Sequence, residues 1–291
     1  MNDVLKKSVG ARRKEMLYQC RQVRHPVVFS HVTQLRVLAL EVPFQRVYDE
    51  SKLHGVVAGA HHRRFDDPQV VLHTWNRMTE EDIVQVDGNV RGLRVEAAIA
   101  SVAKGWDELQ LCLVMDSAIR WKLTSVQRLT EFARTRQFHG KRKYITAVRM
   151  IQPGGFSIQE DRLQLELNRR NVPMFQRNYV VEDARFESGV PMSLDLALPD
   201  ARVGMEYQGD QHRTDRAQYQ RDLYKNNTLR ARNWTIFEVT NADLNDQLRL
   251  DQCATDILRI VAQRTGMDCA MQRMSWNEYA DHRRPYWKRA A

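Results

Sequence analysis

The sequence predicts an α/β protein of two domains, and chain length and hydrophobic periodicity carry that prediction. At 291 residues the chain is long enough for two ordinary domains. Beyond about residue 150 the periodicity indicates the order helix, strand, strand, strand, helix, strand, helix, which is typical of an α/β core with a mixed sheet. Before that point, short strand-like and amphipathic stretches indicate a separate mixed unit.

The composition is that of a soluble globular protein with basic character. Hydrophobic residues make up 43% of the chain and charged residues 28%, and no apolar run approaches the ~20 residues that a membrane span needs. The N-terminal segment lacks the hydrophobic core of a signal peptide, and the four cysteines have no paired spacing. We therefore expect reduced thiols in a cytoplasmic protein, without a zinc finger or a membrane partner. The net charge of +9 favours polyanionic partners such as nucleic acid.

The N-terminal region, residues 1–150, is expected to recognise DNA. Val4 to Gln22 has the pattern of a basic helix, and His31 to Leu40 that of a second helix, capped by Ser30 and with Val32 and Leu35 in its buried stripe. This pattern is compatible with a helix-turn-helix or winged-helix module. An extended segment is expected at 27–29, strands at 56–57, 70–73 and 83–86, and further helices at 95–103, 109–119 and 125–136.

A junction separates this region from the second domain. Phe138 to Lys143 is polar and basic, and 152–155 (QPGG) is a cluster of chain breakers, so we place the boundary between residues 150 and 151. The second domain, 151–265, is expected to begin with a helix from Ser157 to Asn171, in which Ser157 and Glu160 have capping-box spacing. Strands are expected at 175–181, 192–198, 203–208 and 234–239, and helices at 215–232 and 243–262. The basic, aromatic tail, 266–291, is expected to be loosely held.

The segment from Met192 to His212 carries the candidate site. Side chains alternate between the two faces of a strand, so the three leucines of its first strand (Leu194, Leu196 and Leu198) are expected on one face and Asp195 on the other. In its second strand, Glu206 and Gln208 leave the apolar face in the same way. If the two strands pair, the hairpin presents both acids to one site.

Asp195 and Glu206 are therefore the predicted metal ligands. Mg²⁺ (or Mn²⁺) prefers hard oxygen ligands, commonly one or two carboxylates with waters and substrate phosphate. Such an ion polarises a phosphate oxygen and lowers the pKa of a bound water that attacks phosphorus. Gln208 could orient that water or contact the scissile phosphate, but it supplies neither positive charge nor a base. The competing interpretation is that the two acids form a solvated face of a hairpin.

Further candidates surround this pair. Cationic residues that follow the acids suit a phosphodiester backbone, and Arg213, Arg216 and Lys225 are the predicted nucleic-acid contacts. His212 is either a proton carrier or phosphate contact, or an exposed loop residue. Glu160 either completes the capping box or points an auxiliary acid at the metal.

Taken together, these residues resemble the PD-(D/E)xK nuclease superfamily over about 156–244, and more narrowly a bacterial group of domains of unknown function related to very-short-patch-repair endonucleases. The residues that carry the resemblance are Glu160, Arg162-Leu163, Leu194 to Ala197, Pro199 to Val203, Glu206 to Gly209, Gln211-His212, Arg221-Asp222, Asn226 to Leu229, Trp234, Val239-Thr240 and Asp243-Leu244. The resemblance implies a restriction-endonuclease-like core, which is a mixed four-stranded sheet flanked by helices. It also implies Mg²⁺-dependent phosphodiester hydrolysis, with Asp195 and Glu206 on the metal and Glu160 as an auxiliary acid.

Two positions depart from the family pattern. Gln208 stands where the superfamily has a Lys and where relatives in this group more often carry Asp, and Asn233 replaces the Gly that usually precedes the tryptophan. Some restriction enzymes tolerate Gln at the Lys position, so activity remains compatible with the sequence, but the water activator is unassigned. The N-terminal half is similar to regions resembling abortive-infection antitoxins (Ser30 to Leu35, Leu53-His54, Val86 to Gly88, Asp116 to Ala118), which implies a winged-helix DNA-binding segment.

Two function hypotheses follow. The first is a cytoplasmic, metal-dependent DNA endonuclease whose N-terminal region delivers the C-terminal catalytic domain to DNA. The alternative is a non-catalytic DNA-binding regulator or antitoxin that retains a nuclease-like fold, which Gln208 and the expected helix-turn-helix near Ser30 favour. RNA presents the same phosphodiester to a metal, so RNA is a second possible substrate. A homodimer is a further expectation.

Overall fold

The chain divides into two compact units. The computed structural model describes residues 3–59, 67–152, 154–155, 157–208 and 216–282, with the main chain alone at 3–6 and 216–219. Unit 1 comprises Met1–Ile158 together with Ala280–Ala291, and unit 2 comprises Gln159–Tyr279. The boundary thus falls after Ile158, a few residues beyond the chain breakers at 152–155. Among the described residues, no helix combines the length and apolarity needed to cross a bilayer.

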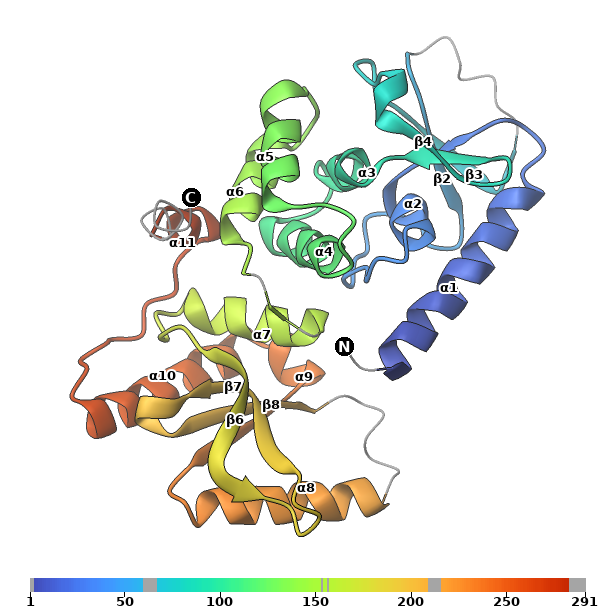
Figure 1. Cartoon of the computed structure of the whole chain (residues 1–291). Helices are drawn as coiled ribbons and strands as arrows, with labels where there is room; N and C mark the ends of the chain where they lie inside the picture. The colour runs from blue at the N-terminus through green and yellow to red at the C-terminus, as the bar shows by residue number, and fades with distance from the viewer. Residues whose placement is uncertain (1–2, 60–66, 153, 156, 209–215, 283–291) are drawn as a thin grey trace. The chain divides into compact units, whose positions relative to one another are not determined.

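Unit 1 contains a mixed five-stranded sheet of order β3-β2-β1-β5-β4 (Figure 1). Its strands are β1 (Val28–Phe29), β2 (Leu53–Val57), β3 (Val70–Thr74), β4 (Ile83–Asp87) and β5 (Val90–Leu93). β1 is parallel to β5 and β2 to β3, whereas β1–β2 and β4–β5 are antiparallel. The expected strands at 56–57, 70–73 and 83–86 are confirmed. β5 was not predicted, because its four residues include Gly92 and an exposed Arg91 and so show no clear alternation.

Helices make up the rest of unit 1. They are α1 (Asp3–Gln22), α2 (His31–Val37), α3 (Val95–Val102), α4 (Glu108–Arg120), α5 (Val126–Thr135) and α6 (Lys141–Met150). The helix α6 corrects the assignment of Phe138 to Lys143 to a junction. It begins inside that basic stretch and buries Tyr144, Ala147 and Met150. Of the basic residues at its start, Arg142 is exposed, whereas the ammonium groups of Lys141 and Lys143 donate to the main-chain carbonyls of Arg136 and Lys104.

The helix α2 starts where the sequence predicts, but it is buried almost all round. Ser30 is its N-cap residue, yet its hydroxyl makes no capping hydrogen bond and instead lies 2.8 Å from Nδ1 of His31. Six of its seven residues are buried, and Arg36 is the exception. A helix that reads a DNA groove needs an exposed row of side chains. In unit 1 the helix α2 does not offer such a row.

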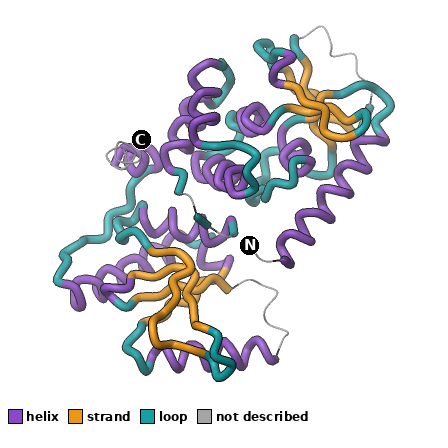
Figure 2. Tube along the Cα trace, in the orientation of Figure 1, coloured by secondary structure: helices purple, strands orange, loops and turns teal. Residues whose placement is uncertain are grey.

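Unit 2 has the predicted order of elements, and its mixed four-stranded sheet has the order β6-β7-β8-β9 (Figure 2). Its elements are α7 (Ile158–Asn168), β6 (Gln176–Arg185), β7 (Pro191–Leu198), η3 (Pro199–Ala201), β8 (Val203–Gln208), α8 (Arg216–Arg230), β9 (Thr235–Thr240), α9 (Asn241–Leu244) and α10 (Gln247–Thr265). The division between the units falls within the last helix, α11 (Trp276–His282), after Tyr279. The pairs β6–β7 and β7–β8 are antiparallel, and the pair β8–β9 is parallel. The single helix expected at 243–262 is two helices, because Asp246 caps the backbone N–H groups of Leu248 and Arg249 and starts α10.

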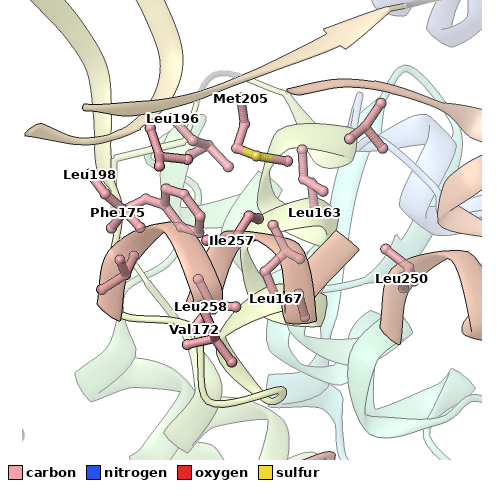
Figure 3. Close-up of a cluster of buried hydrophobic side chains, with 14 of the residues drawn as sticks. Leu163, Leu167, Val172, Phe175, Leu196, Leu198, Met205, Leu250, Ile257 and Leu258 are labelled. Atoms are coloured by element: carbon pink, nitrogen blue, oxygen red, sulfur yellow. The ribbon is translucent and has the colours of Figure 1, made fainter. Parts of the chain in front are cut away.

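Both faces of this sheet carry an apolar cluster. On one face, leucines of α7 and α10 pack against Leu196, Leu198 and Met205 (Figure 3). The other cluster contains Leu194, Ala197, Trp234 and Leu229 of α8. Leu194 therefore does not share a cluster with Leu196 and Leu198, as strict alternation had predicted. The reason lies at Gly204, where an added Cβ would be 2.7 Å from Cδ1 of Leu194, so the Leu194 side chain fills the space that glycine leaves open.

The described part of the C-terminal tail is anchored, which corrects the expectation of a loosely held segment. The N–H of Met274 donates to the carbonyl of Arg169 at 2.8 Å, and the Asn171 side chain donates to the carbonyl of Ala270 at 3.0 Å. The guanidinium of Arg169 lies 4.3 Å from the ring centroid of Trp276. In α11, Tyr279 is 4% exposed. Hydrogen bonds at the end of α7, together with aromatic burial, hold this segment.

Candidate functional site

Asp195 and Glu206 are brought side by side by the pairing of β7 with β8. The β7–β8 register ends at the pair Leu196 and Met205. Asp195 and Glu206 follow directly on their strands, and each carboxylate there accepts a main-chain N–H of the other strand. The strands therefore pair, which was the condition for the two acids to meet. The Glu206 carboxylate lies toward α8, because its Oε1 is 2.7 Å from Nζ of Lys225.

Backbone groups orient both carboxylates. The N–H of Tyr207 donates to Oδ2 of Asp195 at 2.9 Å. In return, the N–H of Asp195 donates to the Glu206 carboxylate. Each carboxylate thus accepts a main-chain N–H of the other strand, which fixes its position on the sheet.

Burial makes this pair electrostatically costly. Burial raises the pKa of Glu206 to about 7. The nearby charge of Asp195 also raises this pKa, whereas the Lys225 ammonium lowers it. Burial also raises the pKa of Asp195, although the Tyr207 N–H and Lys225 act in the opposite direction. Two carboxylates out of water repel each other, and one ammonium compensates only one of them. A further cation would therefore lower the free energy of the pair.

The donor atoms suit a hard divalent cation. The Asp195 and Glu206 carboxylates are the oxygen ligands that Mg²⁺ prefers, and Gln208, two residues along β8 from Glu206, offers an amide oxygen on the same face. Within the part of the chain that the structure describes, no three His, Cys, Asp or Glu side chains come together as a metal-binding group. A coordination shell of two protein carboxylates, waters and phosphate oxygens is nevertheless a common arrangement for Mg²⁺.

Lys225 lies on the inner side of α8 and not on a solvated one. Leu229, one turn later, is fully buried, and Asn226 is 8% exposed, whereas Leu223 is 48% exposed. Residues four apart share a face of a helix, so Leu229 and Lys225 both point to the sheet. The sequence analysis predicted Lys225 as a nucleic-acid contact. In the structure its ammonium contacts Glu206.

The strand β9 adds an acid that sequence analysis did not single out. Glu206 and Glu238 are register partners in the parallel β8–β9 ladder and so share a face of the sheet. The Glu238 carboxylate accepts a hydrogen bond from the side chain of Asn226. Consecutive residues of α8, Lys225 and Asn226, thus bind acids on consecutive strands. The available signal was a single charged residue inside the otherwise apolar segment WTIFEV.

Of the predicted site residues not yet placed, Glu160 alone has a described side chain. Glu160 lies partly buried in the first turn of α7, and it forms no metal-binding group with Asp195 and Glu206 among the described residues. His212 and Arg213 lie outside the described residues. Arg216 begins α8, but its side chain is also outside them.

Comparisons with known proteins add no assignment to this geometry. No family model matches the chain, and neither the curated proteins nor the solved structures include a significant match.

Proposed function

We propose that unit 2 is a metal-dependent nuclease that hydrolyses phosphodiester bonds in DNA, with Asp195 and Glu206 holding Mg²⁺ or Mn²⁺. The observation that carries the proposal is the pair of partly buried carboxylates on the neighbouring strands β7 and β8, with raised pKa values and, among the described residues, the ammonium of Lys225 beside them. Replacing buried charges by apolar residues often stabilises a protein, so such a pair is costly to keep. Ionisable residues whose pKa is shifted by burial and by a charged neighbour occur preferentially at functional sites.

Each residue of the site has a role in this proposal. A bound metal would polarise a phosphate oxygen and supply an activated water. Asp195 and Glu206 would hold it in the orientation that the two backbone N–H groups set. Gln208 would position water or phosphate by hydrogen bonding. Lys225 would bring from α8 the positive charge that Gln208 lacks, and it would attract the phosphate that the acids alone repel.

One observation favours the alternative of a DNA-binding regulator that does not cut. Lys225 already neutralises Glu206 at 2.7 Å, and a scaffold without turnover needs this contact only for folding. The two candidates differ in one outcome, which is metal-dependent strand cleavage.

A cleavage assay separates them. Wild-type chain, Asp195→Asn and Glu206→Gln would be incubated with supercoiled plasmid, single-stranded DNA and RNA, in Mg²⁺, in Mn²⁺ and in EDTA. Glu182→Gln, an exposed acid of β6 in the same sheet, is the matched control. We expect metal-dependent cutting of DNA that falls by about 100-fold or more in both site variants and stays unchanged in the control. Binding without cutting on every substrate would establish the regulator instead.

Metal binding has a readout that does not depend on turnover. A ligand that binds only the folded chain stabilises it by about 2.7 kcal/mol at a concentration of 100 times its Kd. We expect Mn²⁺ to raise the unfolding temperature of the wild-type chain and of Glu182→Gln, but not of Glu206→Gln. An equal shift in all three proteins would place the ion elsewhere.

A further inference from the structure

An aromatic and basic surface lies beside the carboxylate site in unit 2. The rings of Phe186, which follows β6, and Tyr224 of α8 have centroids 6.3 Å apart and planes inclined by 31°. The guanidinium of Arg221 lies 4.9 Å from the ring centroid of Phe186. Tyr224 is 42% exposed. Phe186, Arg221 and Tyr224 are called the stacking platform below.

The stacking platform adjoins the residues that bind the acids. Arg221 and Tyr224 are three residues apart and so lie on one side of α8. Tyr224 immediately precedes Lys225, whose ammonium contacts Glu206. The end of the β6–β7 hairpin lies against this side of the helix (Figure 1). One side of the helix α8 therefore carries the lysine that contacts the carboxylates, and an adjacent side carries two of the three platform residues.

Burial within the core does not account for this surface. Phe186 is partly buried against the apolar cluster that contains Leu229 and Trp234, but Tyr224 is not part of that cluster. Two further apolar side chains nearby in sequence, Leu223 and Val190, are each 48% exposed. An exposed tyrosine on the same side of a helix as an arginine, such as Tyr224 with Arg221, is typical of interaction surfaces, where aromatic residues and arginine are enriched.

We propose that the stacking platform binds an unpaired nucleobase of a nucleic-acid strand whose backbone reaches the carboxylate site. Every base has a π face, and exposed tyrosine, phenylalanine and arginine side chains stack on such faces without regard to sequence. Over residues 220–230, α8 carries Arg221, Lys225 and Arg230 against one acid, Asp222. Lys225 is paired with Glu206, so the guanidinium groups of Arg221 and Arg230 supply the positive charge that suits a polyanion. A base stacked on the platform cannot remain in a duplex, so the ligand is single-stranded or locally unpaired. This inference rests on the proposed function for the placement of the strand.

Binding can be measured apart from cleavage. The full chain carrying Glu206→Gln, in EDTA, would be titrated into labelled strands followed by fluorescence anisotropy. The probes are one sequence as single-stranded DNA, as RNA, as a DNA duplex, and as single-stranded DNA with abasic positions. We expect both unmodified single strands to bind more tightly than the duplex and the abasic strand. The DNA and RNA arms show which sugar the neighbouring contacts prefer.

Variants test the platform itself. We expect Tyr224→Leu to weaken single-strand binding about 5- to 150-fold, which corresponds to ~1–3 kcal/mol for one stacked base. Tyr224→Phe keeps the ring and should bind like the parent, and Arg221→Gln should bind more weakly. Leu248→Ala, at an exposed apolar side chain of α10, is the matched control and should have no effect.

Each outcome decides between the two proposals. Equal affinity for abasic and normal strands, or equal binding by Tyr224→Leu and Tyr224→Phe, would overturn the platform and leave its apolar surface to a protein partner. A wild-type chain that shows base-dependent binding but cuts nothing would overturn the nuclease and leave the platform in place. Cutting of single strands that is unaffected by Tyr224→Leu would overturn the platform and leave the nuclease in place.

Discussion

At the scale of single residues, the balance of charge around Glu206 depends on one side chain. In the described structure Lys225 is the cation within 4 Å of the acid pair, and both it and the Glu206 side chain are 15% exposed. Removing one partner of a buried ion pair leaves the other charge buried and uncompensated, which is more costly than never having the pair. Lys225 is therefore a stabilising residue of the metal-free site as well as the proposed phosphate contact.

This gives a stability prediction for Lys225. We expect Lys225→Met, in EDTA, to lower the free energy of unfolding by about 3 kcal/mol, because Glu206 then has to be protonated or desolvated alone. The double variant Lys225→Met with Glu206→Gln should recover most of this loss. Urea denaturation followed by circular dichroism measures both. Arg230→Met, at an exposed residue of the same helix, is the control and should cost at most ~1 kcal/mol. A double variant no more stable than Lys225→Met would contradict the ion-pair account.

At the scale of elements, a close approach of two backbones sets where α6 begins. Gly140 is its N-cap residue, with φ +81°, and an added Cβ would lie 2.2 Å from the carbonyl oxygen of Ala103. Only glycine tolerates both the left-handed backbone and that contact. The FHGKRK segment is therefore a helix start held against the end of α3, and no composition rule distinguishes this from a polar linker.

Two glycine substitutions separate strain from contact. We expect Gly140→Ala to lower the free energy of unfolding by about 3 kcal/mol or more, since it adds a backbone clash to the unfavourable φ. Gly88→Ala has the same sign of φ, +51°, and nothing within 4 Å of the new Cβ, so it should cost only about 1 kcal/mol. Chemical denaturation of the two variants compares them directly. Equal losses would show that the contact with Ala103 gives way freely.

At the scale of the whole molecule, the two units should respond to acid in opposite directions. Unit 1 contains three clustered imidazoles, in which the His31 and His73 ring centroids are 3.7 Å apart and Nδ1 of His54 lies 2.9 Å from Nε2 of His73. Burial lowers the pKa of all three histidines. Repulsion from the neighbouring imidazoles lowers the pKa of His31 and His73 further, and the pKa of His73 is about 4. Unit 2 contains Glu206, whose pKa is raised to about 7.

The direction follows from which state binds more protons. Near pH 6.5 the histidines take up protons only when unit 1 is unfolded. Their contribution to the free energy of unfolding of unit 1 is therefore complete above that pH and is lost as the pH falls toward 4. Glu206 binds its proton more tightly when folded, so in metal-free chain its contribution grows as the pH falls from 7 to 4.5. Between pH 7 and 5 we expect unit 1 to lose stability while this acid stabilises unit 2.

Hydrogen exchange resolved by peptides measures the two units in one chain. We expect the opening free energy of β2 and β3 to fall between pH 7 and 5, after correction for intrinsic exchange, and that of β7 and β8 to hold or rise. His73→Phe should flatten the response of unit 1, and His139→Gln, at an exposed histidine, should not. Parallel responses in both units would show that neither cluster controls the slope.

Much of the fold could be predicted because its signals are local. The alternation of apolar residues in 192–198 and 203–208 and the longer period of 158–168 predicted the elements of unit 2 in their order. In unit 1, β5 and α6 were not predicted for the same reason: β5 is short and interrupted by Gly92, and α6 starts in a run of basic residues. Their boundaries depend on what they pack against, which a window of sequence does not contain.

The pairing of β7 with β8 could be expected from the sequence, because a hairpin leaves few ways to pair two adjacent strands, and that pairing brings Asp195 and Glu206 together. Strict strand parity, however, failed at the neighbouring Leu194. The partners of these acids were decided by tertiary structure. Lys225 and Asn226 reach Glu206 and Glu238 through the way α8 is rotated on the sheet, and Phe186 meets Tyr224 and Arg221 through the way the β6–β7 hairpin bends toward that helix. Helix rotation is set by the shape of the surface beneath it, here by Leu229 in the core, and that surface exists only once the four strands have come together.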